Sequence, residues 1–487
     1  MTPLSVSIMV GSLSGFSIAL LASVGVGTCF ILLSVAAYRM LLHPLASIPG
    51  PRLAAVSSCW HAYHVRNGRV RLLAQTLHGT YGDCVRVGPN EVWFNSKEAF
   101  DHIYSTSRGC EKSDFYLATR LSRPQMDWHL RLHFPDNLDL LSELNTRRYR
   151  LQRRLIGRTY HASNVAKYDA AIDEVVKRAV TKLASLQGEE LDLKEWMHII
   201  AVECLGAAVL SWSPGLLKVG IDWGTIVHSY RGWRRKSVFG LFPIMTKLEL
   251  LSSDIGRAFA ALCGVTYKTP ANFRPFFPDV SRRVSRRVKA ALRDNPPKDA
   301  RQDLLADLIQ LHKDKPEFNE LYLRKMAVTN FGAGHETMAS TLTSILAMIG
   351  SHPHVQRRVA DEVRQTSKSG PLDNVAKMVY TRATIKEAMR LYPVISMSLP
   401  RRAPAGGLQV GRRWFPPNTT VGCNPVALHR NSSIFGSDAA CFDPGRWLGA
   451  QAGDDTRLRA MDRLIDGAPR ERRLMKPAGK SFLDLTG

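Results

Sequence analysis

The sequence predicts a mainly α-helical protein with a small β portion, attached to a membrane by its N-terminal segment. Three observations lead to this fold class. From about Asn145 to Gly370, apolar residues recur mostly at helical spacing. Short alternating runs near residues 84–95 and 406–424 have the period of strands and are bounded by turn residues. No charged residue occurs from Met1 to Tyr38.

Residues 1–38 predict a transmembrane anchor. The run "GFSIALLASVGVGTCFILLSVAAY" supplies the ~20 apolar residues that cross ~30 Å of hydrocarbon. A cleaved signal peptide is the alternative, but such a peptide has a basic segment first and a shorter apolar core. Arg39, His43 and Arg52 follow the run directly, and this positive charge favours a cytoplasmic location for the rest of the chain.

Residues 39–52 predict a stiff, non-helical connector, because Pro44, Pro49 and Pro51 fix backbone angles and remove hydrogen-bond donors. The runs "CVRVG" and "EVWFN" then predict a hairpin, and "GGLQVGRRWFPPNTTVGCN" predicts further strands near the end. No internal repeat or long linker divides the chain, so we expect one large unit after the anchor.

Composition narrows the function classes. With 66 Lys and Arg against 42 Asp and Glu, the formal net charge is +24, which suits an anionic membrane surface or an acidic protein partner. Nucleic acid is not expected, because no nucleic-acid-binding motif accompanies the arginine clusters. The eight cysteines are scattered without a CxxC pair, which indicates neither a zinc site nor a disulfide framework and favours a reducing compartment.

The segment "FGAGHETMAS", which begins at Phe331, lies inside a predicted apolar helix over 322–349. Glycine in a helix interior costs ~1 kcal/mol relative to alanine, so two glycines here weaken the helix. Gly332 and Gly334 also remove side-chain bulk, which would allow a local bulge or groove to open.

The same segment contains an acid and a hydroxyl. The Thr337 hydroxyl can bond back to the carbonyl of Ala333, four residues earlier. Glu336 and Thr337 would then form an acid–hydroxyl pair beside a small cavity, an arrangement suited to proton transfer. The alternative is a glycine-softened helix with a solvated glutamate.

A second pattern, "TIKEAMRLYP", places Glu387 and Arg390 three residues apart on one helix face among apolar neighbours. Surface pairs at this spacing are common, but a buried pair needs further partners to offset its desolvation. Arg446 in "FDPGRWLG" is the candidate third member of such a network.

Taken together, these features resemble the cytochrome P450 family, in its fungal, membrane-anchored form. The motifs stand in the family's order: the anchor with "HPLASIPGPRLAA", then "AGHET", then Glu-x-x-Arg, then "FDPGRW". "YGDCVRVGPNEVWFN" and "LPRRAPAGG" match its β elements, and the resemblance spans about Tyr38 to Leu464. It implies haem b, O2 as co-substrate, and electrons from NADPH through NADPH–cytochrome P450 reductase. It also implies a single-pass protein of the endoplasmic reticulum membrane whose catalytic domain faces the cytoplasm.

The resemblance assigns roles to named residues. Glu336 and Thr337 match the catalytic acid and threonine that deliver protons to dioxygen, and Ala333 and Gly334 match residues that border the haem. Glu387, Arg390 and Arg446 match a buried structural network. Arg401 matches an arginine that pairs with a haem propionate, and Arg153, less closely, matches a second one. Tyr149 precedes Arg153 by four residues, where family members often have Trp or His.

One departure concerns the iron ligand. The family holds iron through a cysteine in a Phe-x-x-Gly-x-Arg-x-Cys-x-Gly loop, and the printed sequence has no cysteine after Cys441. Cys441 precedes Arg446 and so is out of register for that role, which leaves no metal ligand to assign. Residues 465–487 are arginine-rich and lack helical periodicity, so we interpret them as an atypical tail, out of frame with the family's cysteine loop and the elements after it. The domains expected are therefore the anchor (1–38), the connector (39–52), an incomplete catalytic domain (53–464) and the tail (465–487).

The predicted function is a haem-dependent monooxygenase that inserts one oxygen atom of O2 into a small hydrophobic substrate, by family analogy in fungal secondary metabolism. Two alternatives remain: a catalytically inactive truncated relative, and a basic protein that binds membrane surfaces. The missing thiolate separates the monooxygenase from the inactive relative, and the order of the motifs argues against the membrane-surface protein. The region expected to contact substrate, from Ser113 to Leu141, is apolar and aromatic but identifies no ligand.

Overall fold

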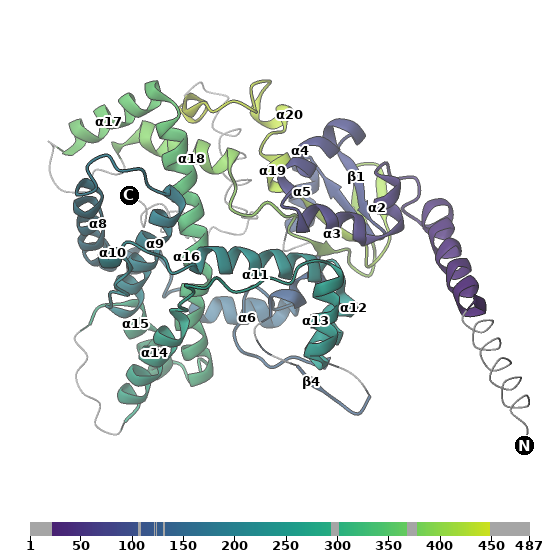
Figure 1. The fold of residues 1–487 in the computed structure, drawn as a ribbon, viewed down its shortest axis with the longest axis horizontal. Coiled ribbons are helices and arrows are strands. Elements are labelled where there is room, and N and C mark those ends of the chain that lie inside the picture. Colours follow the sequence, from purple (N-terminus) through teal and green to yellow (C-terminus); the bar gives the residue numbers. More distant parts are fainter. Residues whose placement is uncertain are drawn as a thin grey trace, which may run out of the picture.

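The computed structural model describes residues 22–448, except 106–108, 121, 123, 130–131, 294–300 and 368–376. Within them the fold is mainly helical with a small β portion, as predicted. A strand-rich part lies nearest the N-terminal helix, and the larger helical part lies on the far side of it (Figure 1). The predicted tail, 465–487, lies outside the described residues.

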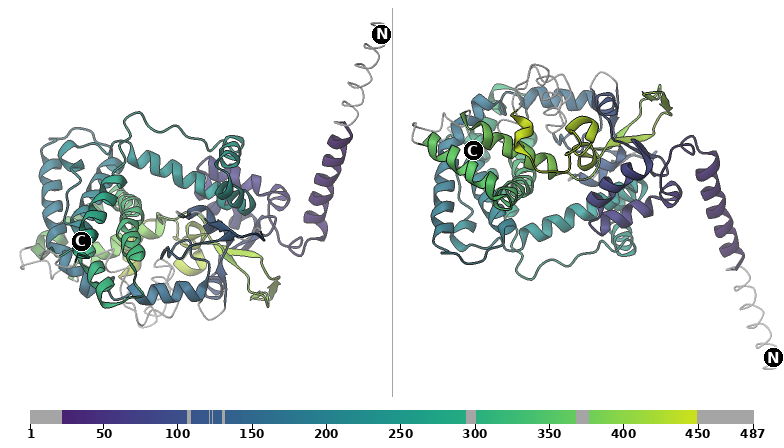
Figure 2. Two further views of the ribbon diagram at one scale, coloured as in Figure 1. Left: turned by 90° about the horizontal axis from the view of Figure 1, so that it is seen from below. Right: turned by 90° about the horizontal axis from the view of Figure 1, so that it is seen from above.

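The N-terminal helix is long and exposed. It runs from Ala22 to Leu42, and none of its most apolar 18-residue window is buried in the protein. Its last turn, η1 (Tyr38–Leu42), is a π-helix, and the helix projects away from the body in every view (Figures 1 and 2). The prediction that residues 39–52 are entirely non-helical is therefore wrong for residues 39–42, and also for Arg52, which begins α2. All three prolines of the connector come after Leu42, so none of them prevents the helix from reaching it.

The strand-rich part joins distant segments of the chain. Its five-stranded sheet has the order β1-β2-β9-β6-β3, in which β2 and β9 are parallel and the other pairs are antiparallel. The predicted hairpin is β1 and β2, and the predicted late strands are β7, β8 and β9. The strands are β1 (Cys84–Gly88), β2 (Glu91–Phe94), β3 (Glu111–Lys112), β4 (Gln125–Met126), β5 (Leu132–His133), β6 (Arg401–Arg402), β7 (Leu408–Val410), β8 (Arg413–Phe415) and β9 (Thr420–Cys423).

Short helices pack around this sheet and connect it to the helical part. They are α2 (Arg52–Val56), α3 (Ser58–Arg66), α4 (Val70–Tyr81), α5 (Lys97–Tyr104), η2 (Asp114–Thr119), α19 (Pro425–Leu428), α20 (Ser432–Phe435) and η5 (Pro444–Trp447).

The helical part surrounds the long helix α16 (Glu320–Gly350), which passes through its middle (Figures 1 and 2). Valines at i, i+4 and i+8 of α14, at positions 280, 284 and 288, are fully buried and show why such periodic segments fold as helices. The other helices here are α6 (Thr146–Ile156), α7 (Ala162–Val165), η3 (Ala166–Tyr168), α8 (Asp169–Ala184), α9 (Leu193–Leu210), α10 (Leu216–Val219), α11 (Thr225–Gly240), α12 (Pro243–Leu251), α13 (Ser253–Leu262), α14 (Phe277–Ala291), α15 (Leu304–Asp314), α17 (Pro353–Ser367) and α18 (Val379–Leu391).

Candidate active site

The centre of α16 is an uninterrupted α-helix, so the bulge that the two glycines suggested is absent from it. Gly334 has a packing role instead. A Cβ atom there would lie 2.8 Å from Leu205 Cδ2 on α9, whereas a Cβ at Gly332 would meet nothing within 4 Å. The missing side chain at Gly334 therefore allows α9 and α16 to approach closely, and the helix stays intact.

Thr337 and Glu336 take different partners. The Thr337 hydroxyl donates to the carbonyl oxygen of Ala333 at 2.7 Å, the back-bond predicted from the spacing. The Glu336 carboxyl group instead lies near Ser229 and Trp233 of α11, and both favour its charged form. The two neighbours on α16 are thus not hydrogen-bonded to each other, and Glu336 belongs to the interface with α11.

Glu336 lies in a partly desolvated position. Burial raises the pKa of its carboxyl group, while Ser229, Trp233 and the charge of Lys236 oppose that rise. In turn, burial lowers the pKa of Lys236, and Glu336 opposes that fall. A carboxyl group with a raised pKa holds a proton more readily near neutral pH, which is what a proton donor needs.

A second group of residues brings three cations together from three elements. Lys112 on β3 is paired in register with Arg401 on β6. The third is Arg153 on α6, and it donates to the hydroxyl oxygen of Tyr149 at 2.8 Å. The Tyr149 ring also lies 4.6 Å from Lys112 Nζ.

These cations repel one another. Burial lowers the pKa of Lys112 to about 8, with Arg401 and Arg153 also lowering it and Asp139 and Glu143 opposing. Among the described ion pairs, no carboxylate lies within 4 Å of Lys112 or Arg401. Two carboxylate groups of a ligand would relieve this repulsion, so the cluster fits the propionates of a haem.

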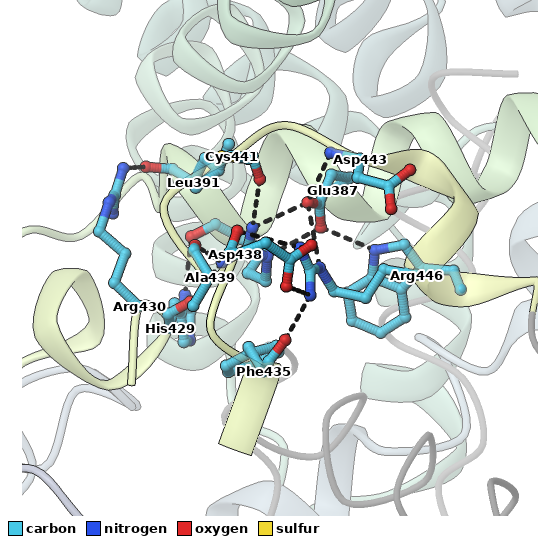
Figure 3. A network of polar contacts seen from close by, with 12 residues as sticks. Glu387, Leu391, His429, Arg430, Phe435, Asp438, Ala439, Cys441, Asp443 and Arg446 are labelled. Atoms are coloured by element: carbon cyan, nitrogen blue, oxygen red, sulfur yellow. Dashed lines mark hydrogen bonds and ion pairs between the residues drawn. The ribbon is translucent and has the colours of Figure 1, made fainter. Parts of the chain in front are cut away.

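The third site is the network around Glu387 on α18 (Figure 3), in which Glu387 pairs with Arg390 of the same helix. Both side chains are fully buried. All five N–H groups of Arg390 have acceptors: the two Glu387 carboxylate oxygens, each at 2.8 Å, and the carbonyls of His429, Ala439 and Cys441. Complete pairing of this kind is what makes a buried ion pair tolerable.

Arg446 completes that network. Its Nε donates to Glu387 Oε1 at 3.4 Å, and its Nη2 donates to Asp438 Oδ2 at 2.7 Å. The backbone N–H of Asp443 and the indole N–H of Trp447 donate to the same glutamate, at 3.0 and 2.9 Å. Glu387 therefore ties α18 to the whole segment that contains "FDPGRW".

The structure thus separates the predicted residues into three places. Glu387, Arg390 and Arg446 come together, Arg153 and Arg401 lie near one another, and Ala333, Gly334, Glu336 and Thr337 share the centre of α16. Sequence reasoning missed Lys112, Ser229 and Trp233. No local pattern distinguishes these three, because each acquires its role only through a partner distant in the sequence.

Comparison with known proteins identifies the family. The family model described as cytochrome P450 matches residues 60–461 of this chain. The chain belongs to the cytochrome P450 family. A cytochrome P450 monooxygenase of Sordaria araneosa, sdnT, is 56% identical over 478 residues, covering 91% of this chain and 85% of that protein. Pisatin demethylase of Fusarium vanettenii is 27% identical over 418 residues, covering 84% and 78%. The cytochrome P450 monooxygenase hepC of Aspergillus oryzae is 27% identical over 443 residues, covering 84% and 80%.

Membership of the cytochrome P450 family confirms the predicted fold class and makes the chain a member of a family of haem-iron oxidoreductases. Cytochrome P450 monooxygenases use O2 and electrons that originate from NADPH and pass through a reductase. Within the described part of the chain, no group of three His, Cys, Asp or Glu residues is placed to hold a metal ion. Cys441 is exposed, and its carbonyl oxygen accepts a hydrogen bond from Arg390.

Proposed function

We propose that this cytochrome P450 inserts one oxygen atom of O2 into a small hydrophobic organic substrate. The observation that carries the proposal is the meeting of Lys112, Arg153 and Arg401, from β3, α6 and β6. Burial and the two neighbouring arginines lower the pKa of Lys112, so an anion bound beside these cations would stabilise its charged form. In a member of this family, the propionates of haem supply that negative charge.

Bound haem supplies the oxygen-activating chemistry, and the residues around it position groups and hold protons. Lys112, Arg153 and Arg401 would bind its carboxylates. Glu336 stores a proton, because burial raises its pKa. The Thr337 hydroxyl donates to the carbonyl of Ala333, so its oxygen remains able to accept a hydrogen bond from a proton donor. Glu387, Arg390 and Arg446 act structurally, by fixing the segment around "FDPGRW" to α18.

The substrate class follows from the surroundings and the relatives. The segment expected to contact substrate contains buried Tyr116 and Leu117 on η2, beside Phe115. These side chains favour an apolar ligand. One relative is a pisatin demethylase, and we propose a fungal secondary metabolite as the substrate here.

We further propose that the catalytic domain, residues 53–464, faces the cytoplasm from the endoplasmic reticulum membrane. The exposed helix Ala22–Leu42 is long enough to span a bilayer, and Arg39 lies at its cytoplasmic end. The electrons would come from NADPH–cytochrome P450 reductase in the same membrane, and the basic surface would favour an acidic partner of this kind.

The iron ligand requires a further proposal. The printed sequence has no cysteine after Cys441, and residues 465–487 do not resemble the family's cysteine loop. We propose that another reading frame or splice choice near Ile465 encodes that loop. The second candidate function is a catalytically inactive relative, which would follow if no frame encodes a cysteine.

The test has two parts, the sequence of the transcripts and the haem content of variants at the proposed haem site. Transcripts are sequenced across the codon for Ile465, and the version with a cysteine loop is produced as the full chain. We expect it to bind haem and give the family's reduced-CO band. Arg401→Ala should lower haem content, whereas Arg402→Ala should not, because Arg402 on the same strand pairs with Glu111 at 3.3 Å. Equal haem content in both variants would mean that Arg401 does not hold a propionate, and a full chain that gives no reduced-CO band would argue for the inactive relative.

A further inference from the structure

A cavity of about 480 Å³ lies where α4, the end of α16, the end of α18 and the segment after α19 meet. Arg71 of α4 and Arg430, which follows α19, line it together with Met348 and Leu391. Met348 is eleven residues beyond Thr337 on α16, which at ~1.5 Å per residue places it roughly 16 Å farther along the helix. None of the residues assigned above to haem binding or proton delivery lines this cavity.

Both guanidinium groups are held at the C-terminal end of α18. Arg430 Nη2 donates to the carbonyl oxygen of Leu391 at 2.5 Å (Figure 3). The guanidinium carbon of Arg71 lies 4.3 Å from the centroid of the Tyr392 ring. Because Leu391 and Tyr392 are consecutive, two cations that are distant in the sequence are held at neighbouring positions on one wall of the cavity.

These two cations lack an acidic partner. Among the ion pairs that the structure describes, none joins a carboxylate to Arg71 or Arg430 within 4 Å, and no Asp or Glu lines the cavity. The pKa of Arg430 is lowered to about 10, by burial first and by the charges of Arg71 and Arg390 next. Glu387 opposes this fall, but both of its carboxylate oxygens already accept from Arg390. The wall formed by Arg71 and Arg430 is therefore positively charged.

The remaining wall is mostly apolar and aromatic. Met348 and Leu391 contribute aliphatic side chains, and the ring centroids of His352 and Phe442 lie 4.8 Å apart. His352 Nδ1 lies 2.8 Å from the carbonyl oxygen of Met348, so this nitrogen carries a hydrogen and the bond fixes the ring. Small-molecule pockets typically have volumes of ~300–1,000 Å³, with mainly apolar walls and a few placed polar groups. The cavity has the size and the composition of such a pocket.

We propose that this cavity binds a small organic anion. Its carboxylate or phosphate group would lie between Arg71 and Arg430, because guanidinium groups form strong charge-assisted hydrogen bonds with both kinds of anion. Its apolar body would lie against Met348, Leu391 and Phe442. The lining comes from α4, beside the sheet, and from α16 and α18 of the helical part, so a bound anion would also connect these two parts of the molecule.

The test measures binding of phenyl phosphate to the full chain in micelles of a neutral detergent, by isothermal titration calorimetry. Phenyl phosphate combines an anionic group with an aromatic body, and benzyl alcohol is its uncharged counterpart. We expect saturable binding of phenyl phosphate and no binding of benzyl alcohol at the same concentrations. Arg71→Gln should weaken binding roughly tenfold or more, because the anion loses a charged donor. Arg71 is exposed, so this variant should fold as the parent does.

Two further variants separate the cavity from other basic surfaces of the chain. Arg69→Gln is the matched control, because Arg69 is an exposed arginine just before α4 that does not line the cavity. It should bind phenyl phosphate as the parent does. Ala440→Trp starts from an exposed lining residue and fills the cavity while both lining arginines remain, so it should abolish binding.

The thermal unfolding midpoint is the second measurement. A ligand that binds only the folded chain raises this midpoint, so phenyl phosphate should raise it in the parent and in Arg69→Gln but not in Ala440→Trp. Phosphatidic acid added to the micelles distinguishes two sources of the anion. Displacement of phenyl phosphate would identify a lipid headgroup and undisturbed binding a soluble metabolite, and both agree with an anion site. Equal binding of benzyl alcohol, no saturable binding of phenyl phosphate, or unchanged binding in Arg71→Gln and Ala440→Trp would overturn the proposal.

Discussion

At the scale of single residues, the sequence predicted local contacts better than distant ones. The back-bond of Thr337 follows from spacing alone, because a helix brings position i near the carbonyl of i−4. Lys112 could not be found in this way. Its neighbour Arg401 comes from the other end of the chain, and only the pairing of β3 with β6 brings the two together. Glu336 likewise turns to α11 rather than to Thr337, a choice that depends on tertiary packing.

Thr337 and Thr343 provide a matched test of the catalytic role. Both lie on α16, and each hydroxyl donates to the carbonyl four residues earlier at 2.7 Å. In the version with a cysteine loop, Thr337→Ala should keep the reduced-CO band but consume NADPH with release of peroxide in place of product. Loss of a directly acting group costs ~10²–10⁴-fold, and a water in the vacated space would reduce that loss. Thr343→Ala should stay coupled. Equal product per NADPH in both variants would mean that Thr337 has no catalytic role.

At the scale of elements, periodicity predicted where α16 lies but not how it packs. The expected helix over 322–349 is observed as Glu320–Gly350. The glycines suggested a bulge because their effect on backbone freedom is visible in sequence. The surfaces that these glycines contact are not visible in sequence, and the observed role of Gly334 depends on Leu205 of α9. The predicted start of the non-helical connector is too early for a similar reason. The prolines lie only in the later part of the connector, and the helix before them continues to Leu42.

Alanine substitutions at the two glycines should have opposite effects on stability. At Gly334, overpacking against Leu205 costs ~1–3 kcal/mol, which exceeds the ~1 kcal/mol gained in helix propensity. At Gly332 there is open space, so Gly332→Ala should stabilise the protein by up to ~1 kcal/mol. The measurement is the urea-unfolding free energy. Adding Leu205→Ala should recover part of the loss in Gly334→Ala. If both single variants are stabilised, close packing at Gly334 is not what holds α9 against α16.

At the scale of the whole molecule, the body and the N-terminal helix are joined by a buried arginine. Arg86 on β1 is 2% exposed and donates to the carbonyls of Arg39 at 2.8 Å and Pro89 at 2.7 Å. Arg39 in turn donates to the carbonyl of Val56 at 2.6 Å. The helix therefore leaves the body from a fixed joint rather than from a loose linker, and this could not be read from the prolines alone.

Deleting residues 1–42 should release much of the protein from microsomal membranes. The helix Ala22–Leu42 has 21 residues, which at ~1.5 Å per residue gives about 32 Å, enough to cross the hydrocarbon core.

Two surfaces could retain the shortened chain. One is basic, given the net charge of +24, and retention through it should disappear at high salt, because salt screens surface charge. The other is apolar: Ile244 and Leu262 are 73% and 82% exposed on α12 and α13, and retention through them should survive salt but be lost in Ile244→Ser with Leu262→Ser. The measurement is the fraction pelleted with membranes at low and high salt. Full retention of the shortened chain under every condition, including the double variant, would contradict anchoring by this helix.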